Sequence, residues 1–259
     1  MVVDMPHSDV PAVRSALRVL DHLAARAGPA PAAAVAQHLG LPRSSVYRLL
    51  TVLREEGYVT HLREERRYTL GPAAHSLATA YTRQAPLTRL ARPVLARLVD
   101  ATGLSAHLAV LDGRDVLYLV DERAPGGPPL VTDVEVRLPS HLTAIGRAIL
   151  ARLPAAHVRA LYPNRAVFAD RTGVGPRSLG ELREVLRLTR RRGYAVEDGE
   201  VMEGVASVGR AIVAHTGFPL GGVALSFPSA VADDARRGEL AVALGRAAAE
   251  IGRRLGGGA

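Results

Sequence analysis

The stretch that decides the fold is residues 39–50, which read LGLPRSSVYRLL. Gly40 favours a tight turn, and Pro42 suits the first turn of a helix, where its missing N–H costs nothing. Four apolar residues then follow the i, i+3, i+4, i+7 spacing of a buried helix face: Val46, Leu49, Leu50 and Leu53. The sequence therefore predicts a turn and then an amphipathic helix over residues 43–56.

The opposite face of this helix is cationic and rich in hydroxyl groups. It carries Arg43, Ser44, Ser45, Tyr47, Arg48 and Thr51, whereas the acidic Glu55 and Glu56 come only at the far end. A helix that enters a DNA major groove needs such donors near bases and phosphates, with acids kept away. An ordinary surface helix of mixed charge would show a similar pattern, so the helix alone leaves both interpretations open.

The flanking residues favour DNA binding. Val13, Leu17, Leu20 and Leu23 predict an earlier helix, and residues 32–39 predict a second. Residues 58–62 and 67–70 alternate like two strands around an exposed turn at 63–66. This order predicts a winged helix-turn-helix whose wing offers Arg63, Arg66 and Arg67 to the DNA backbone. Glu64 and Glu65 could instead neutralise those arginines locally.

Composition bounds the class of protein. The chain has 259 residues, a net charge of +8, 33 arginines, no lysine and no cysteine. The lack of cysteine excludes disulfides, thiolate zinc sites and a thiol nucleophile. No apolar run is long enough to span a membrane, and we expect a soluble, cytoplasmic protein. Residues 1–90 and 91–259 each carry a net charge of +4, so bulk charge identifies no site and fits GC-rich codon usage.

The second half of the chain is predicted to be α+β. A linker helix over 73–88 and an amphipathic stretch to Thr102 come first. Strands are predicted at 106–111, 116–120, 130–136, 205–215 and 220–227. Helices are predicted from Thr143 to Ala151 and at 155–161, 179–192 and 234–255. Antiparallel strands with helices grouped around them form an α+β domain.

The ordered motifs resemble a known family. Residues 15–20, 39–50, 56–59 and 68–71 are similar to the N-terminal domain of the IclR (isocitrate lyase regulator) family, and residues 138–151 and 193–204 are similar to its effector domain. The resemblance implies a winged helix-turn-helix domain over 11–72, a linker helix over 73–88 and a GAF-like effector-binding domain over 89–259. It also implies a DNA-binding transcriptional regulator that forms a homodimer or a dimer of dimers and whose third helix reads an operator palindrome.

The same resemblance implies an effector pocket in the C-terminal domain. Its residues would be Leu130, Ala144, Ile145, Gly146, Glu197, Val205, Ser207, Ala224 and Ser226. The opening turn of the helix at residues 143–146 would offer N–H groups to an anion. The even spacing within each strand pair puts two side chains on one face, although ordinary core residues would follow the same pattern.

The sequence departs from the family at several of these positions. The family often has Asp at Glu197, Cys at Ser207, Ser at Ala224 and Gly at Glu135. The acid pair after the strand that begins with Gly193 and Tyr194 is reduced to Glu200, with Gly199 beside it. The expected effector is a small organic acid or an aromatic catabolite, and the choice between activator and repressor stays open.

Two other classes of protein are weaker alternatives. An enzyme would need an assembled set of catalytic groups, yet the nine histidines are dispersed and no hydrolase or nucleotide-binding motif is present. Ser140 and His141 are adjacent in sequence, which is not how a nucleophile meets its base. We expect no catalysis, cofactor or metal. The second alternative is a ligand-sensing interaction module without specific DNA binding.

Overall fold

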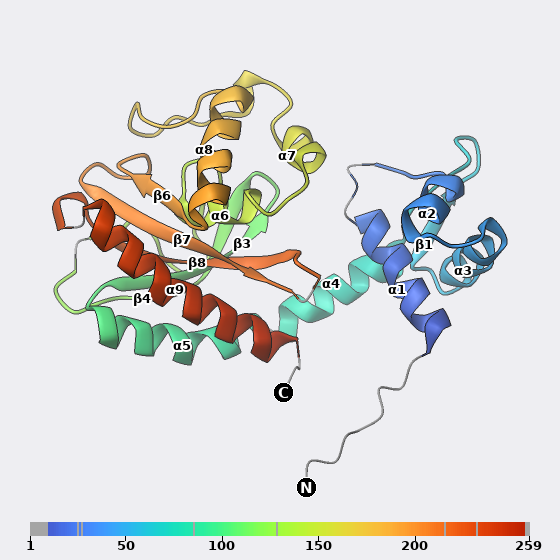
Figure 1. Ribbon diagram of the computed structural model, residues 1–259, viewed down its shortest axis with the longest axis horizontal. Coiled ribbons are helices and arrows are strands. Elements are labelled where there is room, and N and C mark those ends of the chain that lie inside the picture. The colour runs from blue at the N-terminus through green and yellow to red at the C-terminus, as the bar shows by residue number, and fades with distance from the viewer. Residues whose placement is uncertain are drawn as a thin grey trace, which may run out of the picture. The chain divides into compact units, whose positions relative to one another are not determined.

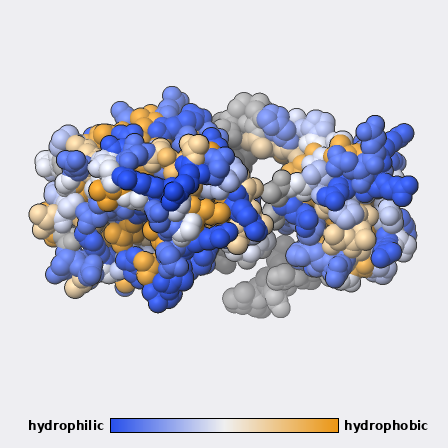
Figure 2. Space-filling view, turned by 90° about the horizontal axis from the view of Figure 1, so that it is seen from above, coloured by the Kyte–Doolittle hydropathy of each residue, from blue (hydrophilic) through white to orange (hydrophobic). Residues whose placement is uncertain are grey.

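The computed structural model describes residues 10–24, 26, 28–84, 86–127, 129–214, 216–231 and 233–256, with the side chains of residues 79–84 left out. The chain forms two compact units, residues 1–84 and 85–259 (Figure 1). This division falls within the segment 73–88 that the sequence predicts as a linker. On the face seen in Figure 2, hydrophilic residues cover much of each unit, with hydrophobic residues between them.

The N-terminal unit is the predicted winged helix-turn-helix. Its elements follow one another in the order α1 Pro11–Ala24, α2 Ala32–Leu39, α3 Arg43–Glu55, β1 Val59–Leu62, β2 Arg67–Leu70 and α4 Pro72–Gln84. Gly40 ends α2 with a positive φ of 67°, which turns the chain into α3. Strands β1 and β2 pair antiparallel as a hairpin.

Helix α3 packs against α1 and α2 in one hydrophobic core. Val46, Leu50 and Leu53 are buried against Val19 and Val35. The predicted helix α1 is confirmed, although Val13 and Leu17 on its apolar side are more than half exposed. The core of the N-terminal unit therefore buries only some of the apolar side chains of α1.

The C-terminal unit contains one six-stranded antiparallel sheet in the order β5-β4-β3-β8-β7-β6. Its strands are β3 Ser105–Asp112, β4 Asp115–Glu122, β5 Arg137–Pro139, β6 Ala195–Asp198, β7 Val205–Val213 and β8 Pro219–Pro228. Its α-helices are α5 Pro86–Thr102, α6 Ala144–Leu150, α7 Ala155–Leu161, α8 Leu179–Arg192 and α9 Asp234–Leu255. The α+β prediction is confirmed.

The helices cover the two faces of this sheet unequally. Helices α5 and α9 pack on one face through the main core, while α6 packs against β7 and β8 on the other (Figure 1). The second face leaves room for a cavity beside α6. No helix within the described residues is long and apolar enough to cross a membrane.

Two strand predictions were wrong in detail. Residues 130–136 form bends and turns, and the strand β5 begins only at Arg137. The reason is a turn at Glu135, whose φ is +69° and whose N–H donates to the carbonyl of Tyr118. The strand predicted to reach residue 215 ends at Val213, and His215 lies outside the described residues.

Candidate functional site

The N-terminal half of α3 presents an exposed polar surface without acids. Arg43, Ser44, Tyr47, Arg48 and Thr51 are exposed, and Ser45 is half-buried. The Tyr47 side chain is 53% exposed, which is high for an aromatic residue with no core role. Because the buried face of α3 fixes the helix on α1 and α2, these side chains form one rigid surface.

The wing stands beside this surface on the same unit. Ala30 exchanges backbone hydrogen bonds with Tyr68, so the hairpin is anchored to the segment before α2. Arg63, Arg66 and Arg67 are exposed, and Arg67 also donates from Nη1 to the carbonyl of Pro29 at 3.2 Å. In the described wing, residues 59–70, no arginine forms an ion pair with Glu64 or Glu65, so the local neutralisation considered above does not occur.

Eight of the nine predicted pocket residues line a single cavity between α6 and the sheet. They are Leu130, Ala144, Ile145, Glu197, Val205, Ser207, Ala224 and Ser226. Strands β7 and β8 bring the two serines together, because Ser207 pairs with Ser226 across the ladder and their Oγ atoms lie 2.9 Å apart.

Gly146 is the exception. Its Cα faces the backbone of Ser140, where an added Cβ would lie 2.2 Å from the Ser140 carbonyl oxygen. Its N–H donates to the side chain of Thr143 at 3.0 Å. Gly146 therefore allows a close backbone approach and does not line the cavity, and one N–H predicted to be free for an anion is already used.

Glu197 is the ionisable group of this cavity. It is 2% exposed, and its Oε1 accepts a hydrogen bond from the N–H of Val201 at 3.1 Å. Burial raises the pKa of Glu197 to about 7, and the neighbouring Glu200 adds to that increase. Burial also raises the pKa of Tyr118, which lines the same cavity. At neutral pH the cavity therefore offers hydroxyl groups and a carboxyl group that holds its proton much of the time.

Sequence reasoning missed six lining residues, namely Tyr118, Val131, Thr132, Thr143, Val201 and Met202. Tyr118 sits on a predicted strand, and its alternation with buried Val116 and Val120 could have indicated it. Thr132 lies in the segment wrongly predicted as a strand. Its hydroxyl is buried without a hydrogen-bond partner, so it is a free polar group in the cavity wall.

The cavity is small, at about 30 Å³. That space is enough for about one or two water molecules. Of its lining, residues 130–132 and 201–202 lie outside helices and strands. Arg123 ties the first segment down, because its Nη2 donates to the Thr132 carbonyl and pairs with the carboxylate of Asp121.

A buried ion pair joins α6 to the chain that follows β6. Arg147 of α6 is 2% exposed, and its Nη1 lies 2.8 Å from Oε1 of Glu200. The same guanidinium donates to the carbonyls of His141 and Val196. Glu200, the acid kept after residue 197, thus fastens α6 to the end of β6.

Ser140 and His141 have separate partners. The Ser140 hydroxyl lies 2.8 Å from the Tyr162 hydroxyl, whereas Nε2 of His141 lies 3.0 Å from the carbonyl of Ala169. Both side chains are buried in a small polar network beside the cavity. The structure does not bring this serine and histidine together as nucleophile and base.

Comparison with known proteins covers nearly the whole chain. The family model described as "Bacterial transcriptional regulator IclR C-terminal" matches residues 79–253, and that described as "IclR helix-turn-helix domain" matches residues 12–63. The glycerol operon regulatory protein of Streptomyces coelicolor is 34% identical over 206 residues, which are 80% of this chain and 79% of that protein.

Solved structures share the fold over a similar extent. The Agobacterium tumefaciens repressor BlcR matches with a TM-score of 0.62 and 29% identity, covering 95% of this chain and 98% of that one. An IclR homologue from Microbacterium hydrocarbonoxydans, complexed with 4-hydroxybenzoate, matches with a TM-score of 0.61 and 20% identity, covering 94% and 98%.

Proposed function

The chain belongs to the IclR family of DNA-binding transcriptional regulators with a C-terminal effector-binding domain, and we propose which of its residues read DNA and which hold the effector. Operator DNA is bound by the N-terminal unit, with α3 in the major groove. The observation that supports this most strongly is the acid-free exposed face of α3, on which Arg43, Tyr47 and Arg48 stand on a rigid core. Such a regulator acts in the cytoplasm, where the chromosome is.

The contacts divide into two kinds. Arg48 and its hydroxyl-bearing neighbours on α3 reach base edges or adjacent phosphates, while Arg63, Arg66 and Arg67 of the wing contact the backbone. Base contacts specify the sequence, and backbone contacts set the register. Loss of a base contact should therefore reduce sequence specificity, whereas loss of a backbone contact should weaken binding to all sequences.

Substitution of Arg48 tests the helix assignment. If Arg48 contacts a base edge, Arg48→Ala weakens binding to the upstream DNA of the protein's own gene by roughly 1–3 kcal/mol. If it contacts phosphate, the substitution lowers the salt dependence of binding by about one charge. Fluorescence anisotropy over a salt series measures both, with Arg183→Ala on helix α8 of the C-terminal unit as a control of equal charge. Unchanged operator affinity for Arg48→Ala would place the reading surface elsewhere.

The effector is a small carboxylic acid held in the cavity beside α6. Ser207, Ser226, Thr132 and the protonated form of Glu197 are donors that a carboxylate or phenol needs, and apolar groups surround them. The homologue that holds 4-hydroxybenzoate is an example of this ligand chemistry within the same fold. Apolar walls with a few placed polar groups are typical of small-molecule sites.

Binding requires the cavity to open. At about 30 Å³ it is far smaller than the several hundred Å³ of a typical ligand site. The segments around Val131 and Val201 are outside regular structure and are the parts that can move. Release of Arg123 from the Thr132 carbonyl frees the first of them.

A thermal-shift titration with small carboxylic acids, including 4-hydroxybenzoate, tests the cavity. A ligand that binds only the folded state raises the midpoint of unfolding, and the gain in stability grows with the logarithm of its concentration over Kd. Ser207→Val removes one hydroxyl from the cavity. It should reduce the shift in the unfolding midpoint for any acid that stabilises the wild type. An equal shift in wild type and Ser207→Val would assign the acid to another site.

The protein works as a homodimer that joins through its N-terminal unit. Val10, directly before α1, and Val13 and Leu17 on α1 are 52%, 55% and 57% exposed and lie three and four residues apart in the sequence. A second copy related by a two-fold axis would cover this stripe and present two α3 helices to a palindromic operator. A dimer of dimers would need a further contact in the C-terminal unit.

A further inference from the structure

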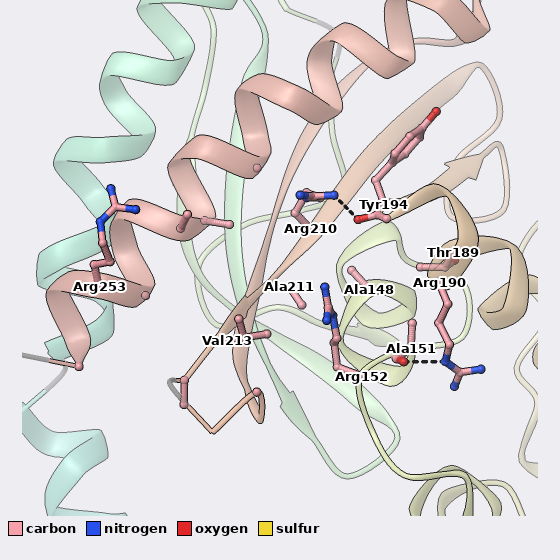
Figure 3. Close-up of a pocket in the computed structure, with 18 residues that line it drawn as sticks. Ala148, Ala151, Arg152, Thr189, Arg190, Tyr194, Arg210, Ala211, Val213 and Arg253 are labelled. Atoms are coloured by element: carbon pink, nitrogen blue, oxygen red, sulfur yellow. Dashed lines mark hydrogen bonds between the residues drawn. The ribbon is translucent and has the colours of Figure 1, made fainter. Parts of the chain in front are cut away.

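A second, larger cleft lies in the C-terminal unit, away from the effector cavity. It has a volume of about 770 Å³ and lies between α9, the end of α6 and the end of α8 (Figure 3). Four arginines from four parts of the chain line it, namely Arg152, Arg190, Arg210 and Arg253. Among the described residues, no acidic side chain lines this cleft.

The cleft exists because β6 is short. Strand β6 pairs with β7 only as far as Ala195 and Gly209, and the chain leaves the sheet at Tyr194. Strand β7 continues to Val213 with β8 alone as its neighbour, so its outer edge is uncovered. The side chains of Ser207 and Arg210 point to opposite faces of β7, which separates the effector cavity from the floor of the cleft.

Arg210 is fitted into the floor. A Cβ at Gly193 would lie 3.0 Å from its Nη1, and a Cβ at Gly245 of α9 would lie 2.9 Å from its Nη2. The two glycines therefore make the slot that admits the guanidinium. Nη1 donates to the Gly193 carbonyl, which leaves Nε and Nη2 without a described hydrogen-bond partner.

Arg152 faces Arg210 across the cleft. Figure 3 shows its side chain extending from the end of α6 towards Arg210. Neither side chain forms an ion pair with a described acid, whereas other arginines of this unit do, such as Arg92, Arg97 and Arg237. Burial and the charge of Arg152 both lower the pKa of Arg210. Two like charges held together without an acid cost free energy that a bound anion would recover.

We propose that this cleft binds a small organic polyanion, one that carries phosphate or several carboxylates, as a site distinct from the effector cavity. Guanidinium groups are matched to the planar geometry of phosphate and carboxylate oxygens. Small residues of α9 and β7, such as Ala211 and Ala248, leave space for a carbon skeleton, and the cleft has the size of known ligand sites. A hollow of this kind suits a compact molecule better than the extended backbone of DNA.

Calorimetric titration of the full chain with pyrophosphate and with citrate tests the site. Both probes should bind the wild type, and Arg152→Gln should weaken binding by about tenfold or more. Arg159→Gln on α7 removes one exposed charge elsewhere and should leave the affinity unchanged. Arg152→Glu should abolish binding while raising the midpoint of thermal unfolding, because it places an acid beside Arg210.

Several results would overturn the proposal. One is absence of binding by both probes, and another is an equal loss for Arg159→Gln and Arg152→Gln. Loss with Arg48→Gln would assign the probes to the DNA-binding face, and loss with Ser207→Val alone would assign them to the effector cavity. A lower midpoint for Arg152→Glu would show that Arg152 already has a favourable partner.

Discussion

In the proposed effector cavity, Glu197 is a polar group from which water is excluded. Its side chain is nearly inaccessible, and burial keeps its proton bound to a pKa of about 7 instead of the ordinary 4.5. The folded state therefore holds a proton that the unfolded state has lost between these two values. The contribution of Glu197 to the free energy of unfolding is therefore greatest below pH 4.5. It falls as the pH rises from 4.5 to 7 and is constant above that range.

Glu197→Gln should remove this pH dependence. The stability of the variant relative to wild type is expected to rise by about 2–3 kcal/mol between pH 5 and pH 8. Urea unfolding at a series of pH values measures the difference. A constant difference across that range would mean that Glu197 ionises normally in the folded protein.

Glu135 has a strained backbone at a position where the family often has glycine. Its φ of +69° is a left-handed conformation that favours glycine, the residue that the resembling family often has here. Glu135→Gly should stabilise the protein by about 0.5–1 kcal/mol, since relief of strain exceeds the greater freedom of the unfolded chain. Glu135→Ala is the matched control, because it removes the charge but keeps the strain. An equal gain in both variants would identify charge, not backbone conformation, as the cause.

At the scale of elements, α1 has an apolar surface that the described residues of its own unit do not bury. Its apolar residues exceed what the core of the unit buries, and Val13 and Leu17 remain exposed. The double variant Val13→Asp, Leu17→Asp should convert the proposed dimer to a monomer and weaken binding to a palindromic operator. Analytical ultracentrifugation measures the first effect.

Val242→Asp provides the comparison for that double variant, because Val242 is 58% exposed on α9 in the other unit. It should leave the association state unchanged. A double variant that stays dimeric would remove the α1 stripe from the interface.

Helices α2 and α3 could be predicted almost to the residue because a turn signal, a helix-compatible proline and a long apolar period all agree there. The segment 130–136 could not, because Leu130, Thr132, Val134 and Val136 fall at every second position, as in a strand. The backbone nevertheless turns at Glu135, where a bond to the Tyr118 carbonyl holds it. Local pattern carries no information about that distant partner.

The same limit applies to the candidate sites. Consecutive sequence predicted Ala144, Ile145 and Gly146 as one group, but helix geometry turns only the first two towards the cavity. The arginine cleft had no sequence signal at all. Arg152 and Arg210 come from different elements. They meet at the edge of β7 only because the pairing of β6 with β7 stops at Ala195 and Gly209.

At the scale of the whole molecule, the two units have separate tasks, and each keeps its polar groups where that task needs them. The N-terminal unit exposes arginine and hydroxyl groups on α3, and the C-terminal unit encloses its own in a cavity beside α6. An effector alters DNA binding only if it favours one of two states of the protein, so the sign of the response follows from that preference. In the proposed function, the effector has a regulatory result only if α3 binds DNA specifically.

Footprinting and titration of the full chain on DNA upstream of its own gene test that claim most directly. At physiological salt we predict protection of a two-fold symmetric segment, with an affinity about a thousandfold or more above that for a scrambled fragment of the same length. Equal affinity for the two fragments, without a protected segment, would contradict the assignment of α3 as the surface that reads an operator.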